Sequence, residues 1–163
     1  MDLEKFWDLI EGSWQDAEDA NKKRLSAIKT NDQGDLEALA DEIEDNVLTT
    51  YEDRLYELEK NELTGFIHIL EERLYNIDRA EIHEYTDGSD DGFLYVRCYI
   101  VAMGRAYYDM IDKDPKKATP DVEAEGFGFT AYSVYADRFD EDFRRGSKHN
   151  IETGSNAKGW PGK

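Results

Sequence analysis

Apolar residues recur every three or four positions through most of the chain, and this spacing constrains the fold more than any other feature of the sequence. An α-helix with one buried face requires it, because three to four residues complete one turn. Two-residue alternation, which would indicate a β-strand, is absent between residues 36 and 58. That segment is therefore predicted to be one long helix with the apolar residues Leu36, Leu39, Ala40, Ile43, Val47, Tyr51, Leu55 and Leu58 on its buried face.

The same spacing predicts helices elsewhere. Asp2 can cap a first helix, which Gly12 and Ser13 are expected to end, and Asn61 can cap a helix over residues 63–77. An aromatic stripe over residues 129–143 predicts a last helix. The sequence thus predicts an all-α, single-domain bundle of about five or six helices.

The most apolar segment starts at Phe93 and is predicted to lie at the centre of the bundle. Both sides of this segment are apolar, and a helix that is hydrophobic all round is buried. We expect a central helix from about Asp90 to Asp112, with the last helix packed on it. Gly104 lies inside this helix, where we expect it to let a neighbouring helix approach closely.

The helical pattern ends near residue 145. Residues 146–163 contain four glycines and no apolar period. We therefore expect an all-helical domain over residues 1–145 and a flexible, glycine-rich tail over residues 146–163. A chain of 163 residues can bury a core without disulfides, and Cys98 is expected to be a buried thiol.

The charge balance indicates which partners the chain can have. Thirty-eight acidic residues against twenty basic ones give a net charge of −18. This charge repels phosphate backbones and anionic lipids and attracts basic partners. We expect a basic protein partner, no nucleic acid and no membrane. A single cysteine and the lack of a signal-peptide pattern favour a cytoplasmic location.

The stretch DGSDDGF, before the central helix, is the strongest candidate for a chemical site. Asp87 could open a calcium loop, but Cys98 stands where that loop requires a bidentate Glu. Ser89 is also a good N-cap, with Asp90 and Asp91 in the first turn, where the helix dipole favours acids. We therefore favour a helix start over a metal site.

Other motifs for catalysis or metal binding are incomplete. None of His68, His83 and His149 follows a Glu by three residues, as a di-iron site requires, and one cysteine cannot form a thiolate zinc site. The sequence has no Gly-x-Ser-x-Gly elbow and no P-loop. We predict no catalytic residue, no metal and no cofactor.

The segment DGSDDGFLYVRCYIVAMGRAYYDMI resembles the bacterial domain of unknown function 4240 family, whose members carry a Cys-Ser-Asp-Asp-Gly-Phe segment before an aromatic, apolar helix that ends in a Gly-Arg pair. The segments FWDLIE, ELTGFIHILEERLY and FTAYSVYADRF lie in the order that the family suggests. The resemblance covers most of residues 1–143. Gly88 stands in place of the family's Cys, and residues 76–79 in place of a tryptophan-rich turn. The resemblance implies an all-helical bacterial domain and supplies no catalytic residues, because no activity is established for the family. The residues that match its most specific stretch are Ser89, Asp90, Asp91, Gly92, Phe93, Gly104 and Arg105.

Two functions fit these observations. The first is a non-catalytic interaction protein, such as an immunity or inhibitor protein that neutralises a basic toxin, nuclease or regulator by direct binding. The second is a small-ligand-binding or catalytic domain with a carboxylate and arginine pocket at Asp90, Asp91 and Arg97, beside Trp7 or Trp14. The contact residues predicted for the first function are Asp41, Glu42, Asp45, Asp137, Asp140, Glu141 and Asp142.

Overall fold

A computed structural model describes residues 1–86 and 88–162, and within them the chain is helical without a β-strand. The all-α prediction is confirmed, although the helices are more numerous than the five or six expected. In the described residues no helix combines the length and the apolar character needed to cross a bilayer. The elements are α1 (Leu3–Asp16), α2 (Glu18–Thr30), α3 (Gln33–Glu42), a π-helical segment (Ile43–Val47), α4 (Leu48–Tyr56), α5 (Lys60–Asn76), α6 (Ala80–His83), α7 (Asp90–Ala102), α8 (Arg105–Lys113), a 3₁₀ turn (Pro115–Lys117) and α9 (Glu125–Phe139).

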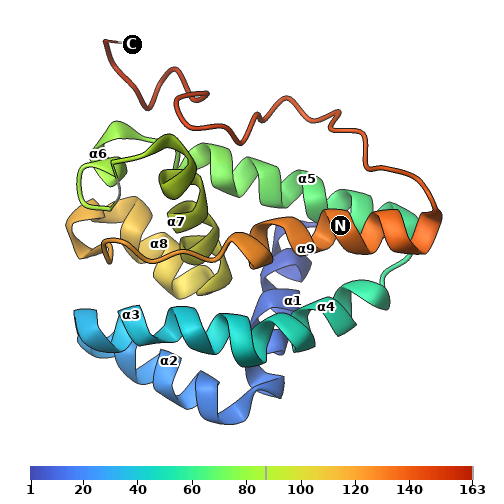
Figure 1. The fold of residues 1–163 in the computed structure, drawn as a ribbon, viewed down its shortest axis with the longest axis horizontal. Helices are drawn as coiled ribbons and strands as arrows, with labels where there is room; N and C mark the ends of the chain where they lie inside the picture. Colours follow the sequence, from blue (N-terminus) through green and yellow to red (C-terminus); the bar gives the residue numbers. More distant parts are fainter. Residues whose placement is uncertain (87, 163) are drawn as a thin grey trace.

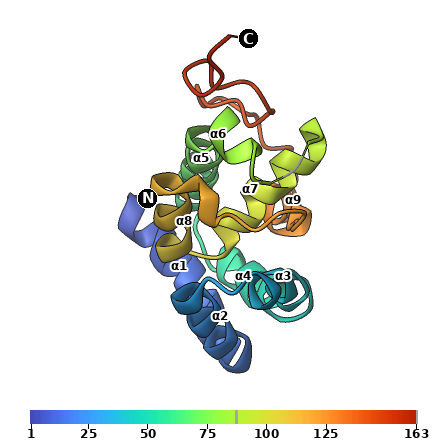
Figure 2. The same ribbon diagram turned by 90° about the vertical axis from the view of Figure 1, so that its left-hand side faces the viewer.

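The helices surround a core that is rich in aromatic residues. Figures 1 and 2 show α2 and α3 on one side of the molecule and the C-terminal tail on the opposite side, beyond α5 and α6. Five aromatic side chains of this core are fully buried: those of Phe6, Tyr51, Phe66, Phe93 and Tyr99. The π-helical segment joins α3 and α4 into one long helix, which follows the predicted segment 36–58 (Figure 1).

Helix α1 is capped as predicted but is longer than expected. The Asp2 carboxylate accepts a hydrogen bond of 2.9 Å from the Lys5 backbone N–H. Gly12 and Ser13 do not end the helix, which continues to Asp16. Both residues are buried, and the Ser13 hydroxyl donates to the carbonyl of Leu9 one turn earlier, so its polar group is satisfied within the helix.

Helix α5 begins before the predicted cap. Glu59 and Glu62 form a capping box, in which each side chain accepts a hydrogen bond from the backbone of the other residue. Asn61 therefore lies inside the first turn and does not cap the helix. Two glutamates satisfy the exposed N–H groups here, where a single Asn was expected to do so.

The expected helix from Asp90 to Asp112 is two helices. Ser89 caps α7 as predicted, since its hydroxyl accepts a hydrogen bond of 2.9 Å from the Gly92 N–H. Ten of the thirteen residues of α7 are buried. The helix ends at Ala102, because Gly104 has a φ of +88°, which no α-helix contains, and α8 starts at Arg105.

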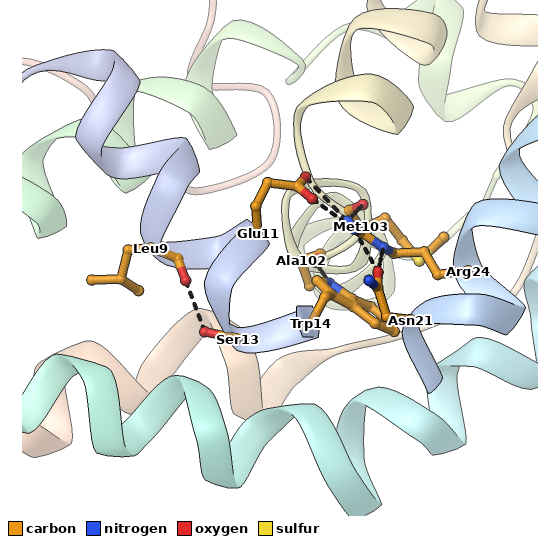
Figure 3. A network of polar contacts seen from close by, with 8 residues as sticks. All are labelled: Leu9, Glu11, Ser13, Trp14, Asn21, Arg24, Ala102 and Met103. Carbon is orange, nitrogen blue, oxygen red and sulfur yellow. Dashed lines mark hydrogen bonds and ion pairs between the residues drawn. The ribbon is translucent and has the colours of Figure 1, made fainter. Parts of the chain in front are cut away.

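Side chains from α1 and α2 hold the C-terminal end of α7 (Figure 3). The Trp14 indole N–H donates to the carbonyl of Ala102, and the Arg24 guanidinium donates to the carbonyl of Met103. Arg24 also pairs with Glu11 and lies 4.8 Å over the Trp14 ring. Donors and a cation at this position satisfy carbonyls that a helix end leaves without partners.

Gly128 allows α9 to lie directly against α7. A Cβ at this position would overlap the Sγ atom of Cys98 and lie 3.3 Å from its Cβ. We expect Gly128→Ala to destabilise the protein by about 2 kcal/mol, since overfilling a packed core costs about 1–3 kcal/mol. Urea unfolding measures this difference. In a Cys98→Ala background the added penalty should shrink, and an equal penalty in both backgrounds would contradict the proposed clash.

Over its described residues 146–162 the tail forms no helix, but it makes many contacts with the domain. The sequence predicted residues 146–163 to be flexible. In the structure Ile151 is 2% exposed, and the buried side chains of Asp78 and Arg97 hydrogen-bond to the tail. Glycine content and the absence of apolar periodicity predicted the irregular backbone, and they carried no information about these contacts.

Candidate functional site

A groove with a volume of about 380 Å³ lies between α3 and the segment that precedes α9. Its carboxylates come from Glu37 and Asp41 on α3 and from Asp121 and Glu123 on the other side. No basic residue lines it. We call this surface the acidic groove. Its lining residues are Gly34, Glu37, Ala38, Ala40, Asp41, Asp121, Val122 and Glu123.

Local structure fixes both walls of the acidic groove. Glu37 and Asp41 are four residues apart on a helix, which places them one turn above each other on the same exposed face. On the other wall Val122 is 2% exposed and holds the segment to the core. Asp121 beside it has a φ of +56°, in the left-handed region that Asp tolerates better than most residues.

The four carboxylates have no partner within the part of the chain that the structure describes. None of them forms an ion pair with a Lys, Arg or His side chain or accepts a side-chain hydrogen bond there. Like charges in one groove repel each other, and a cation placed between them relieves this repulsion. The acidic groove can therefore attract a Lys or Arg side chain without first losing an internal ion pair.

The negative potential extends from the groove towards α7. A hydrogen bond to Glu125, together with the nearby charges of Asp91 and Glu123, raises the pKa of Tyr95 above its ordinary value. The backbone carbonyl of Tyr95 also accepts a hydrogen bond of 3.1 Å from the Ala124 N–H. Asp91 therefore belongs to the same acidic side of the molecule as the groove.

The predicted contact residues on the α3 side have different surroundings. Asp41 lines the groove, and Asp45 is exposed on the π-helical segment without an ion pair in the described residues. Glu42 instead pairs with Lys23, whose hydrogen bond lowers the pKa of the Glu42 carboxyl. It also accepts a hydrogen bond of 2.7 Å from Asn46. Asp41 and Asp45 are thus more available to a partner than Glu42.

The second predicted cluster lies around the end of α9 and is partly paired. Glu141 forms an ion pair with Lys60, which lowers the pKa of the Glu141 carboxyl. Asp137 accepts a hydrogen bond of 2.8 Å from the hydroxyl of Tyr56. Asp140 ends α9 in the left-handed conformation, with a φ of +51°.

The pocket beside this cluster contains both charges. It has a volume of about 550 Å³ and includes His68, Glu141, Asp142 and Arg144. A pocket between α2 and α3, of about 570 Å³, likewise contains Lys22 and Lys23 beside Asp35 and Glu42. Both are larger than the acidic groove, but the cations that they contain offset the attraction of their carboxylates for a basic partner.

The residues of the alternative ligand site do not converge. The Arg97 side chain is fully buried, and its guanidinium donates to the carbonyls of Leu74 and Ile151. Asp90 and Asp91 are exposed in the first turn of α7. Trp7 and Trp14 are buried in the core as well, at 3% and 0% exposure. The structure places none of these aromatic rings beside an open carboxylate and arginine pocket.

The described residues contain no group of three or more His, Cys, Asp and Glu side chains arranged to hold a metal ion. Asp87, the first position of the calcium-loop hypothesis, lies outside the described residues. Cys98, at the position of the missing bidentate ligand, is buried in α7, and burial raises the pKa of its thiol to about 12. A thiol in this state is neutral near pH 7.

Sequence reasoning missed three of the four carboxylates in the acidic groove. Glu37 precedes Asp41 by four residues, and this spacing could have identified it as a member of the same face. The sequence DVEAE at residues 121–125 is also acidic. Nothing in the sequence, however, places that segment beside α3, because the two are about eighty residues apart and meet only in the folded chain.

Comparison with known proteins identifies the family. Searches of curated proteins and of solved structures gave no match. The family model that matches, described as protein of unknown function (DUF4240), covers residues 1–141. It includes α1 to α9, the Ser89-capped start of α7 and both walls of the acidic groove, and it leaves out the tail. With most of its length matched in this way, the chain belongs to the DUF4240 family.

Proposed function

We propose that this chain is a non-catalytic interaction protein that binds a basic protein partner through the acidic groove, as an inhibitor or immunity protein of a basic toxin, nuclease or regulator would do. The observation that carries the proposal is the set of four carboxylates in one groove without a paired cation among the described residues. The net charge of −18 supports it, because thirty-eight acidic residues cannot all pair with twenty basic ones within the chain, and the unpaired acids attract a basic partner.

Unpaired carboxylates suit this function better than paired ones. A partner that docks on Glu42 or Glu141 must compete with Lys23 or Lys60 for the same oxygen atoms. A partner that docks on the acidic groove gains the attraction without breaking an internal pair. Exposed ion pairs contribute about 0.2–1 kcal/mol each, so four of them together can change a dissociation constant by about tenfold or more.

The charge also affects the rate of association. An acidic surface around the groove steers a basic protein into contact and can raise its association rate by about ten- to a thousandfold at low salt. At an ionic strength of 0.1 M the screening length is only about 10 Å, so this advantage falls as salt is added. The proposal therefore predicts association that slows steeply with salt.

Charge-neutralising variants test the site. We expect the variant with Glu37→Gln, Asp41→Asn, Asp121→Asn and Glu123→Gln to bind a short oligolysine peptide about tenfold more weakly than the wild-type chain at low salt, as measured by isothermal titration calorimetry. A control variant neutralises four exposed acids outside the groove: Asp8→Asn, Asp53→Asn, Glu57→Gln and Glu84→Gln. Both variants change the net charge equally, and equal weakening by both would reject the groove as the site.

The same two variants test the biological partner. In a pull-down from the native cell, the wild-type chain and the control variant should recover a stoichiometric basic protein, and the groove variant should recover much less. If that protein is a toxin or nuclease, adding the wild-type chain should reduce its activity in proportion to binding. A recovered partner that is acidic, or that the groove variant retains in full, would contradict the proposal.

A further inference from the structure

Three charged side chains of the matched domain are buried beneath the tail. Glu71 on α5, Asp78 after α5 and Arg97 on α7 are 1%, 0% and 0% exposed. Buried charges are stable only when hydrogen bonds satisfy them. Each of the three takes at least one of its hydrogen-bond partners from residues 147–160, which lie outside the family match.

The Asp78 carboxylate accepts hydrogen bonds from two backbone N–H groups and one side chain of the tail. One of its oxygens accepts from the Gly154 N–H at 3.0 Å and from the Trp160 indole N–H at 2.9 Å. The other oxygen accepts from the Asn156 N–H at 3.0 Å. All three hydrogen bonds that this carboxylate accepts in the described structure come from the tail. Without the tail, the Asp78 carboxylate would keep the nearby charge of Arg97 but would accept its hydrogen bonds from water.

Arg97 donates hydrogen bonds to a second part of the tail, at Ile151 and Thr153. Its guanidinium donates to the carbonyl of Leu74 within the domain, and to the carbonyl of Ile151 and the hydroxyl of Thr153 in the tail. The Thr153 hydroxyl in turn donates to the backbone carbonyl of Asp90 at 2.6 Å. The Nε atom of Arg97 has no hydrogen-bond partner in the described structure. The site thus binds backbone groups of a turn-containing segment with a carboxylate and a guanidinium.

Apolar and amide side chains of the tail occupy defined positions. Ile151 is 2% exposed and Asn156 is 8% exposed. The Trp160 ring lies 5.3 Å from the ring of His83 and 6.0 Å from that of Phe93, measured between ring centroids. These three side chains follow the pattern of a peptide ligand, in which backbone contacts are combined with a few anchored side chains.

The tail has little structure of its own. Its internal backbone hydrogen bonds span two or three residues, such as the one from the Ser155 N–H to the Glu152 carbonyl. Between α9 and the anchored part, Arg144, Arg145 and Gly146 are exposed. Figures 1 and 2 show the tail crossing the outer surface of the molecule beside α5 and α6. The domain therefore determines the path of the tail, and an exposed linker connects the two.

We propose that Glu71, Asp78 and Arg97 form a peptide-binding site of the domain, and that residues 147–160 are its ligand, bound within the same chain. The ligand class is a peptide without regular secondary structure, folded through short turns, that presents an Ile, an Asn and a Trp at the spacing of Ile151, Asn156 and Trp160. The occupant is this C-terminal segment. This proposal is independent of the acidic groove, whose lining contains no residue of the tail and none of Glu71, Asp78 and Arg97.

Attachment to the domain keeps the site filled. A short flexible linker holds a tethered ligand at an effective concentration in about the millimolar range. Even a modest intrinsic affinity is then enough for full occupancy. When the tail leaves, water can satisfy Asp78 and Arg97, so departure of the segment exposes charges and does not require the helical core to open.

A cleavable full-length chain tests the proposal. A protease recognition sequence is inserted between the exposed residues Arg145 and Gly146, and the protein is cut after it has folded. We expect the cut protein to keep its helical circular dichroism. A fluorescent peptide of residues 147–162 should replace the severed tail, with one peptide bound per domain in anisotropy titrations. The uncut protein should bind this peptide much more weakly, because its own tail competes.

Variants of the added peptide distinguish specific from non-specific binding, and they leave the domain unchanged. Unlabelled peptides with Ile151→Ala or Trp160→Ala should compete about tenfold or more weakly, since truncating the buried Ile151 or the half-buried Trp160 removes its contacts. A peptide with Lys148→Ala, which changes an exposed side chain, should compete within about threefold of the unchanged peptide. The proposal is overturned if the domain loses its helices when the tail leaves, if no peptide enters, or if all peptides compete equally.

Discussion

Replacing Gly104 by alanine is expected to destabilise the protein by about 3 kcal/mol or more. Gly104 follows the end of α7 with a φ of +88° and a ψ of 174°, a region that is essentially restricted to glycine and costs a residue with a Cβ about 1–3 kcal/mol. The Cβ would also lie 2.6 Å from the Nη1 atom of Arg24 and would overlap the carboxylate of Glu11. Moving this packed ion pair out of its place adds a cost of about 1–3 kcal/mol.

Chemical unfolding of Gly104→Ala and Gly88→Ala measures this effect against a matched control. Gly88 is exposed, and no atom lies within 4 Å of the position that a Cβ would take there, so alanine should fit with little change in the free energy of unfolding. Gly104→Ala should lower the midpoint strongly while Gly88→Ala should not. A similar, small change in both variants would show that neither the backbone conformation nor the packing at Gly104 is required.

The second large effect is expected for Arg24→Met. The guanidinium of Arg24 is almost completely buried and binds Glu11, Asn21 and the carbonyl of Met103 (Figure 3). Methionine can fill much of the same volume but donates no hydrogen bond. Removing one partner of a fully buried ion pair typically costs about 3–5 kcal/mol. The Glu11 side chain is 33% exposed and can be hydrated, so we expect a loss of about 3 kcal/mol, which includes the donor that the end of α7 loses.

The adjacent residue provides the control for Arg24. Lys23 is on the same helix and also pairs with a glutamate, Glu42, but its side chain is 64% exposed. Lys23→Met should therefore cost less than about 1 kcal/mol. In the Arg24→Met background, the penalty of Gly104→Ala should be smaller than in the wild-type chain, because the clashing guanidinium is gone. Additive penalties would show that the two residues do not share one network.

The parts of the fold that depend on neighbours in sequence could be predicted. Asp2 and Ser89 cap helices as expected, because a cap is formed by a side chain and an N–H group three residues later. The break between α7 and α8 at Gly104 could not be predicted in this way. The positive φ of Gly104 divides the predicted single helix into two, and the side chains of Glu11 and Arg24 that pack against it lie about eighty or more residues away in sequence, so the prediction of one helix was wrong.

In the candidate site, too, features set by sequence neighbours could be predicted, and features set by distant residues could not. The exposed acids Asp41 and Asp45 could be selected from the sequence, because the helical period separates the exposed face from the buried face. Which acids are paired could not be selected, since Lys60 and Glu141 are 81 residues apart and meet only after folding. The position of Asp121 beside α3 could not be predicted for the same reason.

The π-helical segment Ile43–Val47 could also have been found in the sequence. From Leu39 to Leu55 the buried residues follow in four steps of four, and in a regular helix each such step turns about 40° too far. The accumulated rotation of about 160° would carry Leu55 to the opposite side of the helix. The π turn takes up one extra residue, about 100° of that rotation, and keeps all of these residues within one apolar face.

This segment therefore tolerates a change of length in one direction only. Loss of one exposed residue, such as Asp45, would turn the π turn into a regular α-helical turn and leave α3 and α4 facing the core as before. Gain of one residue there would instead rotate α4 by about 100° and expose Tyr51 or Leu55 to water. Shorter relatives of this chain can thus share its core, whereas a one-codon insertion at this point would break the hydrophobic register between two halves of one helix.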